Sequence, residues 1–124
     1  MKPYKKPIIF LLGPTASGKT DWAIYWLNQF RSLEIISVDS VMVYKECNIG
    51  SAKPSNEVLK KYPHHLVNHV SLDHVFSVAN FLDAANQKIS EIHAQDKMPL
   101  LVGGSMMYFL SLIHISEPTR QVPI

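Results

Sequence analysis

Gly13-Pro14-Thr15-Ala16-Ser17-Gly18-Lys19-Thr20 is the stretch from which the fold can be predicted, because it matches the whole pattern G-x-x-x-x-G-K-[ST]. Its glycines allow the backbone to wrap closely around a polyphosphate, with successive amide N–H groups pointing inward. Lys19 supplies a positive charge for the terminal phosphates, and the Thr20 hydroxyl is suited to coordinate Mg²⁺. The stretch predicts a phosphate-binding loop, and the alternative is an ordinary glycine-rich turn that caps a helix.

The segments on both sides of this loop predict a strand and a helix. Residues 8–12 form a continuous apolar run with β-branched side chains, which is typical of a strand buried on both faces. From Lys19 to about Phe30, apolar residues recur at helical spacing, and they are Trp22, Ala23, Trp26, Leu27 and Phe30. We interpret Trp22 and Trp26 as packing residues of the core or of a partner helix. Strand, loop and helix together are the context that a phosphate-binding loop requires.

Further strands and a long helix are expected downstream. Residues 34–38 and 98–102 are short buried-strand patterns, and the second closes at Gly103-Gly104. Ser77 is a good N-cap for a helix that continues to about Asp96, with an apolar face made of Val78, Phe81, Leu82, Ala85, Ile89 and Ile92. Residues 41–75 predict loops and short helices, and another helix is expected from Ser105. This order predicts an α/β fold, a P-loop NTPase-like parallel sheet flanked by helices.

Composition excludes several classes of protein. A length of 124 residues supports one domain, and a net charge of +2 is too small to indicate a nucleic-acid-binding protein by electrostatics alone. Cys47 is the only cysteine, which excludes an intramolecular disulfide and a thiolate metal cluster. The apolar run at residues 7–12 is too short to span a bilayer. We therefore expect a cytoplasmic protein that does not associate with a membrane.

Asp39 is a candidate catalytic residue because it follows directly after the second predicted strand. Open α/β sheets bind their ligands at the carboxyl ends of the strands. A carboxylate there can act as a general base, or it can reach a metal through water. Capping of the next helix is an equally common role for Asp at such a position, and the local sequence leaves both roles open.

Histidines are numerous between residues 64 and 74 but predict no metal site. Their spacing matches no standard zinc pattern, and they have no cysteine beside them to complete one; they are His64, His65, His69 and His74.

Taken together, the motifs resemble those of bacterial tRNA dimethylallyltransferases. GPTASGKT (13–20) is followed by SVDS and VY within residues 37–44, NIGSAKPS (48–55), PHHL (63–66) and PLLVGGSMMYF (99–109), in the order and spacing of that family. Many nucleotide-binding proteins share the first motif, whereas IGSAKP and PHHL have no role in generic P-loop kinases. The resemblance covers about residues 8–109 and is specific.

This resemblance implies a reaction and a set of site residues. Such enzymes transfer the dimethylallyl group of dimethylallyl diphosphate to N6 of the adenosine on the 3′ side of the anticodon in tRNA. The resemblance implies that residues 13–20 bind the diphosphate, that Mg²⁺ is coordinated by Thr20, and that Asp39 is the general base. It also implies contacts with the tRNA anticodon loop from Asp39, Ser40, Val41, Met42 and Ser105, the last standing where the family usually has Thr. We expect the intact enzyme to be a monomer that does not use ATP as its substrate.

The end of the chain does not continue the family pattern. LSLIHISEPTR (110–120) is identical to one reading frame of a transposase adapter used in DNA sequencing. We therefore expect residues 1–109 to be a truncated P-loop core and residues 110–124 to be a non-native tail, with a genuine divergent terminus as the alternative. The fragment itself is expected to be inactive, because the family's tRNA-binding helical insert and a C-terminal Arg that neutralises the diphosphate are absent.

Three other functions stay open at this stage. The first is an isopentenyltransferase that acts on free adenine nucleotides, which a product assay on AMP and tRNA would distinguish. The second is a P-loop kinase of a nucleoside or small metabolite, which requires ATP-dependent phosphoryl transfer. The third is a non-catalytic fragment that binds diphosphate or nothing, which thermal protection by dimethylallyl diphosphate with Mg²⁺ would test.

Overall fold

Apolar segments far apart in the sequence pair into one parallel sheet in the computed structural model, which describes residues 7–12, 19–40, 42–46 and 53–104. The elements in this part of the chain are β1 (Ile9–Leu12), α1 (Lys19–Gln29), β2 (Leu33–Val38), α2 (Asn56–Lys61), β3 (His64–His65), α3 (Val78–Ala94) and β4 (Met98–Gly103). Both strands predicted after α1 and the long helix are confirmed to within a few residues at each end.

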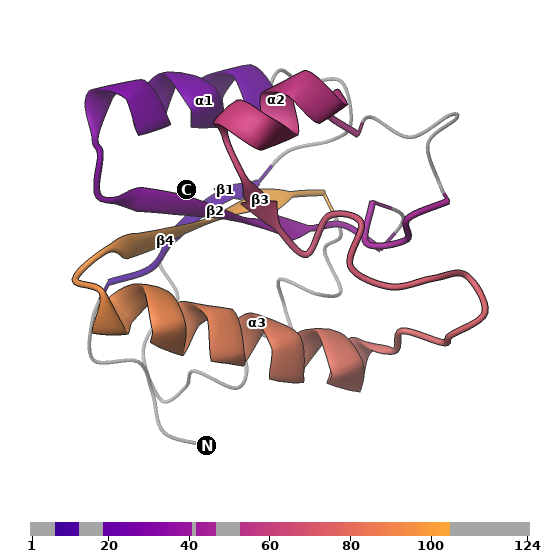
Figure 1. Ribbon diagram of the computed structural model, residues 1–124. Helices are drawn as coiled ribbons and strands as arrows, with labels where there is room; N and C mark the ends of the chain where they lie inside the picture. Colours follow the sequence, from indigo (N-terminus) through magenta and orange to yellow (C-terminus); the bar gives the residue numbers. More distant parts are fainter. Residues whose placement is uncertain (1–6, 13–18, 41, 47–52, 105–124) are drawn as a thin grey trace.

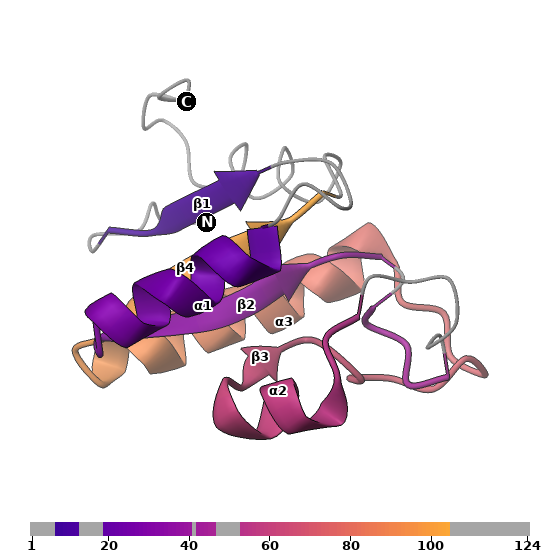
Figure 2. The same ribbon diagram turned by 90° about the horizontal axis from the view of Figure 1, so that it is seen from above.

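The last strand in sequence lies between the first two in space. The order across the sheet is β1-β4-β2-β3, and every neighbouring pair is parallel. Figure 2 shows β4 running between β1 and β2 beneath helix α1. Helix α1 therefore connects β1 to β2 across the position of β4, and α3 connects β3 back to β4 across the position of β2. This is the connectivity of an α/β sheet with helices on both faces.

Side chains of the two central strands alternate between two apolar cores. Ile35 and Leu100 belong to the core under α1, which also contains Ala23, whereas Ile36 and Leu101 belong to the core over α3. Figure 1 shows α1 and α3 on opposite faces of the sheet. Because both faces are covered, the central strands consist of continuous apolar runs instead of alternating polar and apolar residues. The predicted α/β fold class is confirmed.

Helix α3 begins where its sequence predicts. The Ser77 side chain accepts a hydrogen bond from the Asn80 backbone N–H (3.1 Å), and the Asn80 side chain accepts one from the Ser77 backbone N–H (3.0 Å). This reciprocal capping box satisfies backbone donors that the first turn of a helix leaves without partners. The residues of α3 that are buried against the sheet are Phe81, Ala85, Ile89 and Ile92.

The apolar face of α1 is narrower than its sequence predicts. Ala23 is buried, and Trp26 and Leu27 pack partly against the sheet, but Trp22 is 57% exposed and Phe30 is 58% exposed. The prediction that Trp22 packs in the core is therefore wrong. Trp22 lies about 100° around the helix from the buried Ala23. Its ring packs edge to face against that of Tyr25, with the two ring centroids 6.2 Å apart. Phe30 follows the last helical residue, Gln29, and its side chain does not join the core.

The region between residues 41 and 75 contains more order than its periodicity suggests. Helix α2 agrees with the expected short helices, and in Figure 1 it lies on the same side of the sheet as α1. The two-residue strand β3 was not predicted, and it pairs Ile35 with His64 and Ile36 with His65. A strand of two residues is too short to give an alternation pattern, so the sequence carries no signal for it.

Gly103 provides a stability prediction because β2 and β4 approach closely at this residue. It is the register partner of Val38, and a Cβ atom on Gly103 would collide with the Val38 carbonyl group. We expect Gly103→Ala to lower the free energy of unfolding by about 2–3 kcal/mol, since the collision is with backbone that cannot rotate away. Urea denaturation measures this, with Ser90→Ala on the exposed side of α3 as control, expected within about 0.5 kcal/mol of the unmodified chain. If Gly103→Ala changed the free energy of unfolding as little as the control does, β2 and β4 could not approach each other this closely at Gly103.

Candidate functional site

The carboxyl ends of three strands form one straight edge. Leu12 of β1 is the register partner of Gly103 of β4, and Gly103 is the partner of Val38 of β2. Leu12 immediately precedes the predicted phosphate-binding loop, and Val38 immediately precedes Asp39. The loop and the acid predicted from the sequence are therefore brought to the same edge of the sheet, where α/β folds bind ligands.

The spacing along this edge suits a substrate placed between the two features. Neighbouring strands lie about 4.8 Å apart, so β1 and β2, separated by β4, are about 10 Å apart. Asp39 therefore lies two strands away from Leu12, the residue that precedes the predicted loop. A diphosphate near β1 and a nucleophile near Asp39 can occupy the edge together.

The phosphate site is described only in part. Lys19 and Thr20 are the first residues of α1, the helix that follows the loop, so the positive end of the helix dipole faces the loop. The side chains of Lys19 and Thr20 lie outside the described structure, as do six predicted ligands and two predicted tRNA contacts: Gly13, Pro14, Thr15, Ala16, Ser17, Gly18, Val41 and Ser105. The placement of α1 agrees with the predicted phosphate site, and the individual ligands stay predictions.

Asp39 is half-buried and caps a turn instead of a helix. Its Oδ1 accepts a hydrogen bond from the Met42 backbone N–H at 3.0 Å. In the described residues 42–46 no helix follows Asp39, so the alternative that it serves as a helix N-cap is wrong. The turn holds the carboxylate in one orientation at the strand end. Ser40 follows Asp39 directly and Met42 is hydrogen-bonded to it, so both lie at this edge next to the acid. Ser40 is exposed and Met42 is half-buried.

A second segment supports the turn that contains Asp39. The backbone N–H of Asn68 donates to the Met42 carbonyl (3.0 Å), and those of His69 and Val70 donate to the Val43 carbonyl (2.7 and 3.0 Å). The Lys45 N–H donates in turn to the Val70 carbonyl (2.9 Å). Residues 42–46, which follow β2, and residues 68–70, which follow β3, therefore form one hydrogen-bonded unit beside Asp39. Sequence periodicity gave no indication of this pairing.

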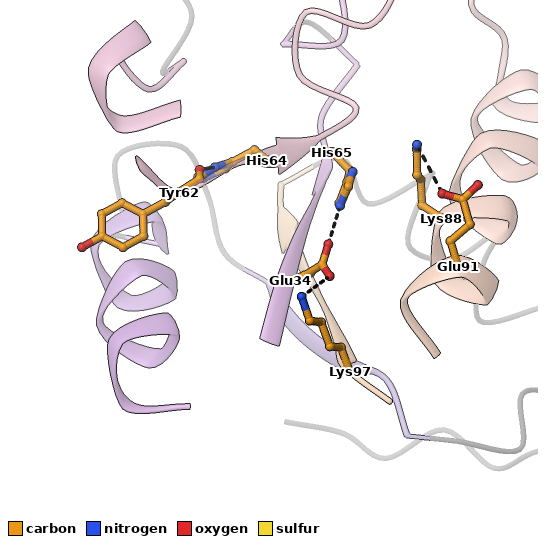
Figure 3. A network of polar contacts seen from close by, with 7 residues as sticks. All are labelled: Glu34, Tyr62, His64, His65, Lys88, Glu91 and Lys97. Carbon is orange, nitrogen blue, oxygen red and sulfur yellow. Dashed lines mark hydrogen bonds and ion pairs between the residues drawn. The ribbon is translucent and has the colours of Figure 1, made fainter. Parts of the chain in front are cut away.

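The histidines serve structural roles in the part of the chain that the structure describes. The ring of His65 contacts Glu34 at 2.8 Å, and Lys97 contacts the other oxygen of Glu34 at 3.2 Å, as Figure 3 shows. Burial alone would raise the pKa of Glu34, but its hydrogen bonds with His65 and Lys97 bring that pKa below its usual value. No group of three His, Cys, Asp or Glu side chains suited to a metal ion exists among the described residues.

The donor chemistry at the strand edge is compatible with Mg²⁺. This ion is typically bound by one or two protein oxygens, with the remaining positions filled by substrate phosphates and water. Thr20 at the start of α1 and Asp39 at the end of β2 are oxygen-bearing residues of that kind at one edge. A cage of three carboxylates is not required, so its absence from the described residues does not conflict with Mg²⁺.

No helix among the described residues combines the length and the apolar character that a bilayer span requires.

Comparison with known proteins identifies close relatives. The sequence profile described as IPP transferase matches residues 42–122. A tRNA dimethylallyltransferase of Vesicomyosocius okutanii is 50% identical over 109 residues, which are 88% of this chain and 35% of that protein. A Methylobacillus flagellatus protein of the same name is 52% identical over 106 residues, or 86% of this chain and 33% of that protein. The chain thus spans about a third of the length of these relatives.

Solved structures that resemble this chain carry similar names. The full-length tRNA isopentenylpyrophosphate transferase of Bacillus halodurans superposes with a TM-score of 0.83 and 37% identity, covering 94% of this chain and 38% of that one. A eukaryotic dimethylallyltransferase described as acting on tRNA superposes with a TM-score of 0.78 and 31% identity, covering 85% of this chain and 26% of that one.

His64 gives a prediction about the pH dependence of stability. Burial of its ring lowers the pKa of His64, although its Nδ1 also lies 2.6 Å from the Tyr62 carbonyl oxygen, a contact that favours the protonated ring. The unfolded chain therefore binds a proton at higher pH than the folded chain does. The contribution of His64 to the free energy of unfolding is therefore fully present above pH 6.5, the ordinary pKa of the ring, and falls as the pH drops below that value.

Substitution of His64 tests this dependence. We expect His64→Gln to flatten the change in the free energy of unfolding between about pH 7.5 and pH 5.5, because a group that titrates in that range is removed. His74→Gln is the matched control, since His74 is exposed beside Asp73. Urea denaturation across this pH range measures both variants. Identical slopes for the two variants would show that burial of His64 has no such effect.

Proposed function

The chain belongs to the IPP transferase family, and from this membership we propose that the protein modifies tRNA by transferring a dimethylallyl group from dimethylallyl diphosphate to N6 of the adenosine 3′ of the anticodon. The observation that carries the proposal is the alignment of Leu12, Gly103 and Val38. This alignment brings the carboxyl ends of β1 and β2 to one edge of the sheet, and the predicted phosphate-binding loop and Asp39 follow these two ends in the sequence. Relatives named for this reaction support the choice of substrates.

The phosphate-binding loop would hold the leaving group. As the allylic C–O bond breaks, its electron pair stays on the diphosphate, whose negative charge increases. Inward-pointing amides of residues 13–18, the Lys19 ammonium and the amino end of α1 would stabilise that charge. Thr20 would hold Mg²⁺, which supplies further neutralisation of the diphosphate when bound.

Asp39 would serve the nucleophile. The exocyclic amine of adenine is weakly nucleophilic, because its lone pair is delocalised into the ring. As the new C–N bond forms, the amine becomes positively charged and must lose a proton, and the Asp39 carboxylate would accept it. The Met42 N–H bond to Oδ1 keeps the carboxylate oriented before substrate binds. The adenine must leave the anticodon-loop stack to reach this edge, as bases do in other base-modifying enzymes.

The tRNA contacts extend this arrangement. Ser40 and Met42 lie beside Asp39, and with Val41 and Ser105 they are the proposed contacts to the anticodon loop. A macromolecular substrate is favoured over free adenine nucleotides because the relatives are named for tRNA. Cytoplasmic location and a monomeric state belong to the same proposal, since the relatives are named for tRNA and every residue assigned a role above belongs to one chain.

Substitution of Asp39 tests the proposed chemistry in the complete gene product. We expect Asp39→Asn to lower kcat for dimethylallyl transfer by about 10²- to 10⁴-fold, because an amide cannot accept the proton, while the KM for dimethylallyl diphosphate stays unchanged. Asp83→Asn on the exposed side of α3 is the matched control and should retain full activity. Transfer of label from dimethylallyl diphosphate to tRNA measures both. Full activity of Asp39→Asn would exclude Asp39 as the general base.

The 124-residue chain allows a separate test of phosphate binding. We expect dimethylallyl diphosphate with Mg²⁺ at saturating concentration to raise the melting temperature by about 5 °C or more, because ligand binds only the folded state. Lys19→Ala should abolish this rise, and Lys60→Ala on the exposed face of α2 should not. Thermal shift measurements decide the matter. Protection by ATP together with phosphoryl transfer would favour a kinase, and absence of any protection would leave the chain a non-binding fragment.

A further inference from the structure

Lys53 is half-buried beside the candidate site and donates hydrogen bonds to two segments that are separate in the sequence. It lies in the NIGSAKPS segment (48–55), to which the proposed reaction assigns no role. Its Nζ donates a hydrogen bond to the Tyr44 backbone carbonyl (2.8 Å) and another to the Asn68 side-chain Oδ1 (2.7 Å). Lys60 and Lys61, by contrast, are exposed. A half-buried ammonium directed at neutral oxygens of two separate segments indicates a role in holding those segments together.

The two segments that Lys53 joins are those that form the turn next to Asp39. Tyr44 belongs to residues 42–46, which follow β2, and Asn68 belongs to residues 68–70, which follow β3. The Asn68 backbone N–H donates to the Met42 carbonyl, and the Met42 N–H donates to Asp39 Oδ1. A continuous series of hydrogen bonds therefore runs from Lys53 through Asn68 and Met42 to the Asp39 carboxylate.

Asn68 is suited to the central place in this series. Its φ angle is 56°, in the left-handed region that Asn adopts more readily than most other residues. In this conformation its backbone N–H bonds to Met42 while its side chain bonds to Lys53. Loss of the Lys53 donor would leave both the Asn68 amide oxygen and the Tyr44 carbonyl without that partner, and the turn would be free to adopt other arrangements.

We propose that Lys53 is a positioning residue for Asp39. By holding Asn68 and Tyr44, it fixes the Met42 N–H that orients the Asp39 carboxylate toward the substrate amine. The proposal rests on the proposed function in assigning Asp39 the role of base. Lys53 acts through Asn68 and Met42 and touches neither substrate. The competing role for a lysine near an RNA site is a direct contact with a phosphate of tRNA. Nζ bonds to two segments of the protein itself favour positioning over that role.

The kinetic test uses the complete gene product. Lys53→Met keeps the apolar stem and removes the donor, and we expect it to lower kcat about 10- to 100-fold with little change in KM for dimethylallyl diphosphate or tRNA. Asn68→Gly keeps the left-handed backbone and removes the acceptor, and it should lower kcat to a similar extent. Because both changes break one series, the double variant should be no worse than the more damaging single variant. Lys60→Met is the matched control with unchanged kcat.

A structural measurement on the 124-residue chain separates this proposal from the proposed function. Hydrogen exchange of the Met42 amide, followed by NMR, should accelerate at least about tenfold in Lys53→Met and in Asn68→Gly but not in Lys60→Met, at equal global stability. Unchanged exchange of this amide in both variants would overturn the positioning role even if the enzyme is active. If Asp39→Asn is harmless while the amide responds as expected, the proposed function fails and the structural role of Lys53 stands.

Two kinetic outcomes would also overturn the proposal. A raised KM for tRNA with unchanged kcat, together with weaker salt dependence of tRNA binding, would make Lys53 a phosphate contact. If Lys53→Met abolished activity while Asn68→Gly left kcat unchanged, Lys53 would not act through Asn68. If Lys53→Met fails to fold, Asn68→Gly and its Met42 exchange rate carry the same test.

Discussion

The hydrogen-bonded register between β2 and β4 is the constraint on which the rest of the structure depends. It aligns Val38 with Gly103, and the pairing of β4 with β1 extends the same row to Leu12. Only a residue without a Cβ fits beside the Val38 carbonyl at this position. Since the strands end together, the chain leaves the sheet in adjacent places, and the residues that follow can act on one substrate.

The site also depends on segments outside the predicted phosphate-binding loop. Asp39 is oriented by the Met42 N–H, and the segment around Met42 is held by residues 68–70, which follow a strand of two residues. Lys53 connects these segments from a third part of the sequence. The predicted phosphate-binding loop would provide the diphosphate site, whereas this network explains how the proposed proton acceptor is held at the end of β2.

The sequence was sufficient to predict elements that depend on short-range patterns of residues. It was not sufficient for elements that depend on pairing between distant segments. Buried-strand runs such as residues 98–102 and the Ser77 cap could be recognised, because burial on both faces and helix capping leave short-range patterns. Strand β3 and the pairing of residues 42–46 with 68–70 could not, because they depend on contacts between distant backbone groups of any composition. Trp22 was misplaced because helical spacing does not reveal how wide a face the sheet covers.

The central claim is that one sheet edge binds a diphosphate and presents a base to an adenine of tRNA. The most direct measurement is to incubate the complete gene product with isotopically labelled dimethylallyl diphosphate, Mg²⁺ and tRNA, and to locate the label by nuclease digestion and mass spectrometry. The account predicts a single labelled nucleoside, adenosine carrying the dimethylallyl group on N6, directly 3′ of the anticodon. Label on free AMP but not on tRNA, or no transfer by a folded protein that binds both substrates, would contradict it.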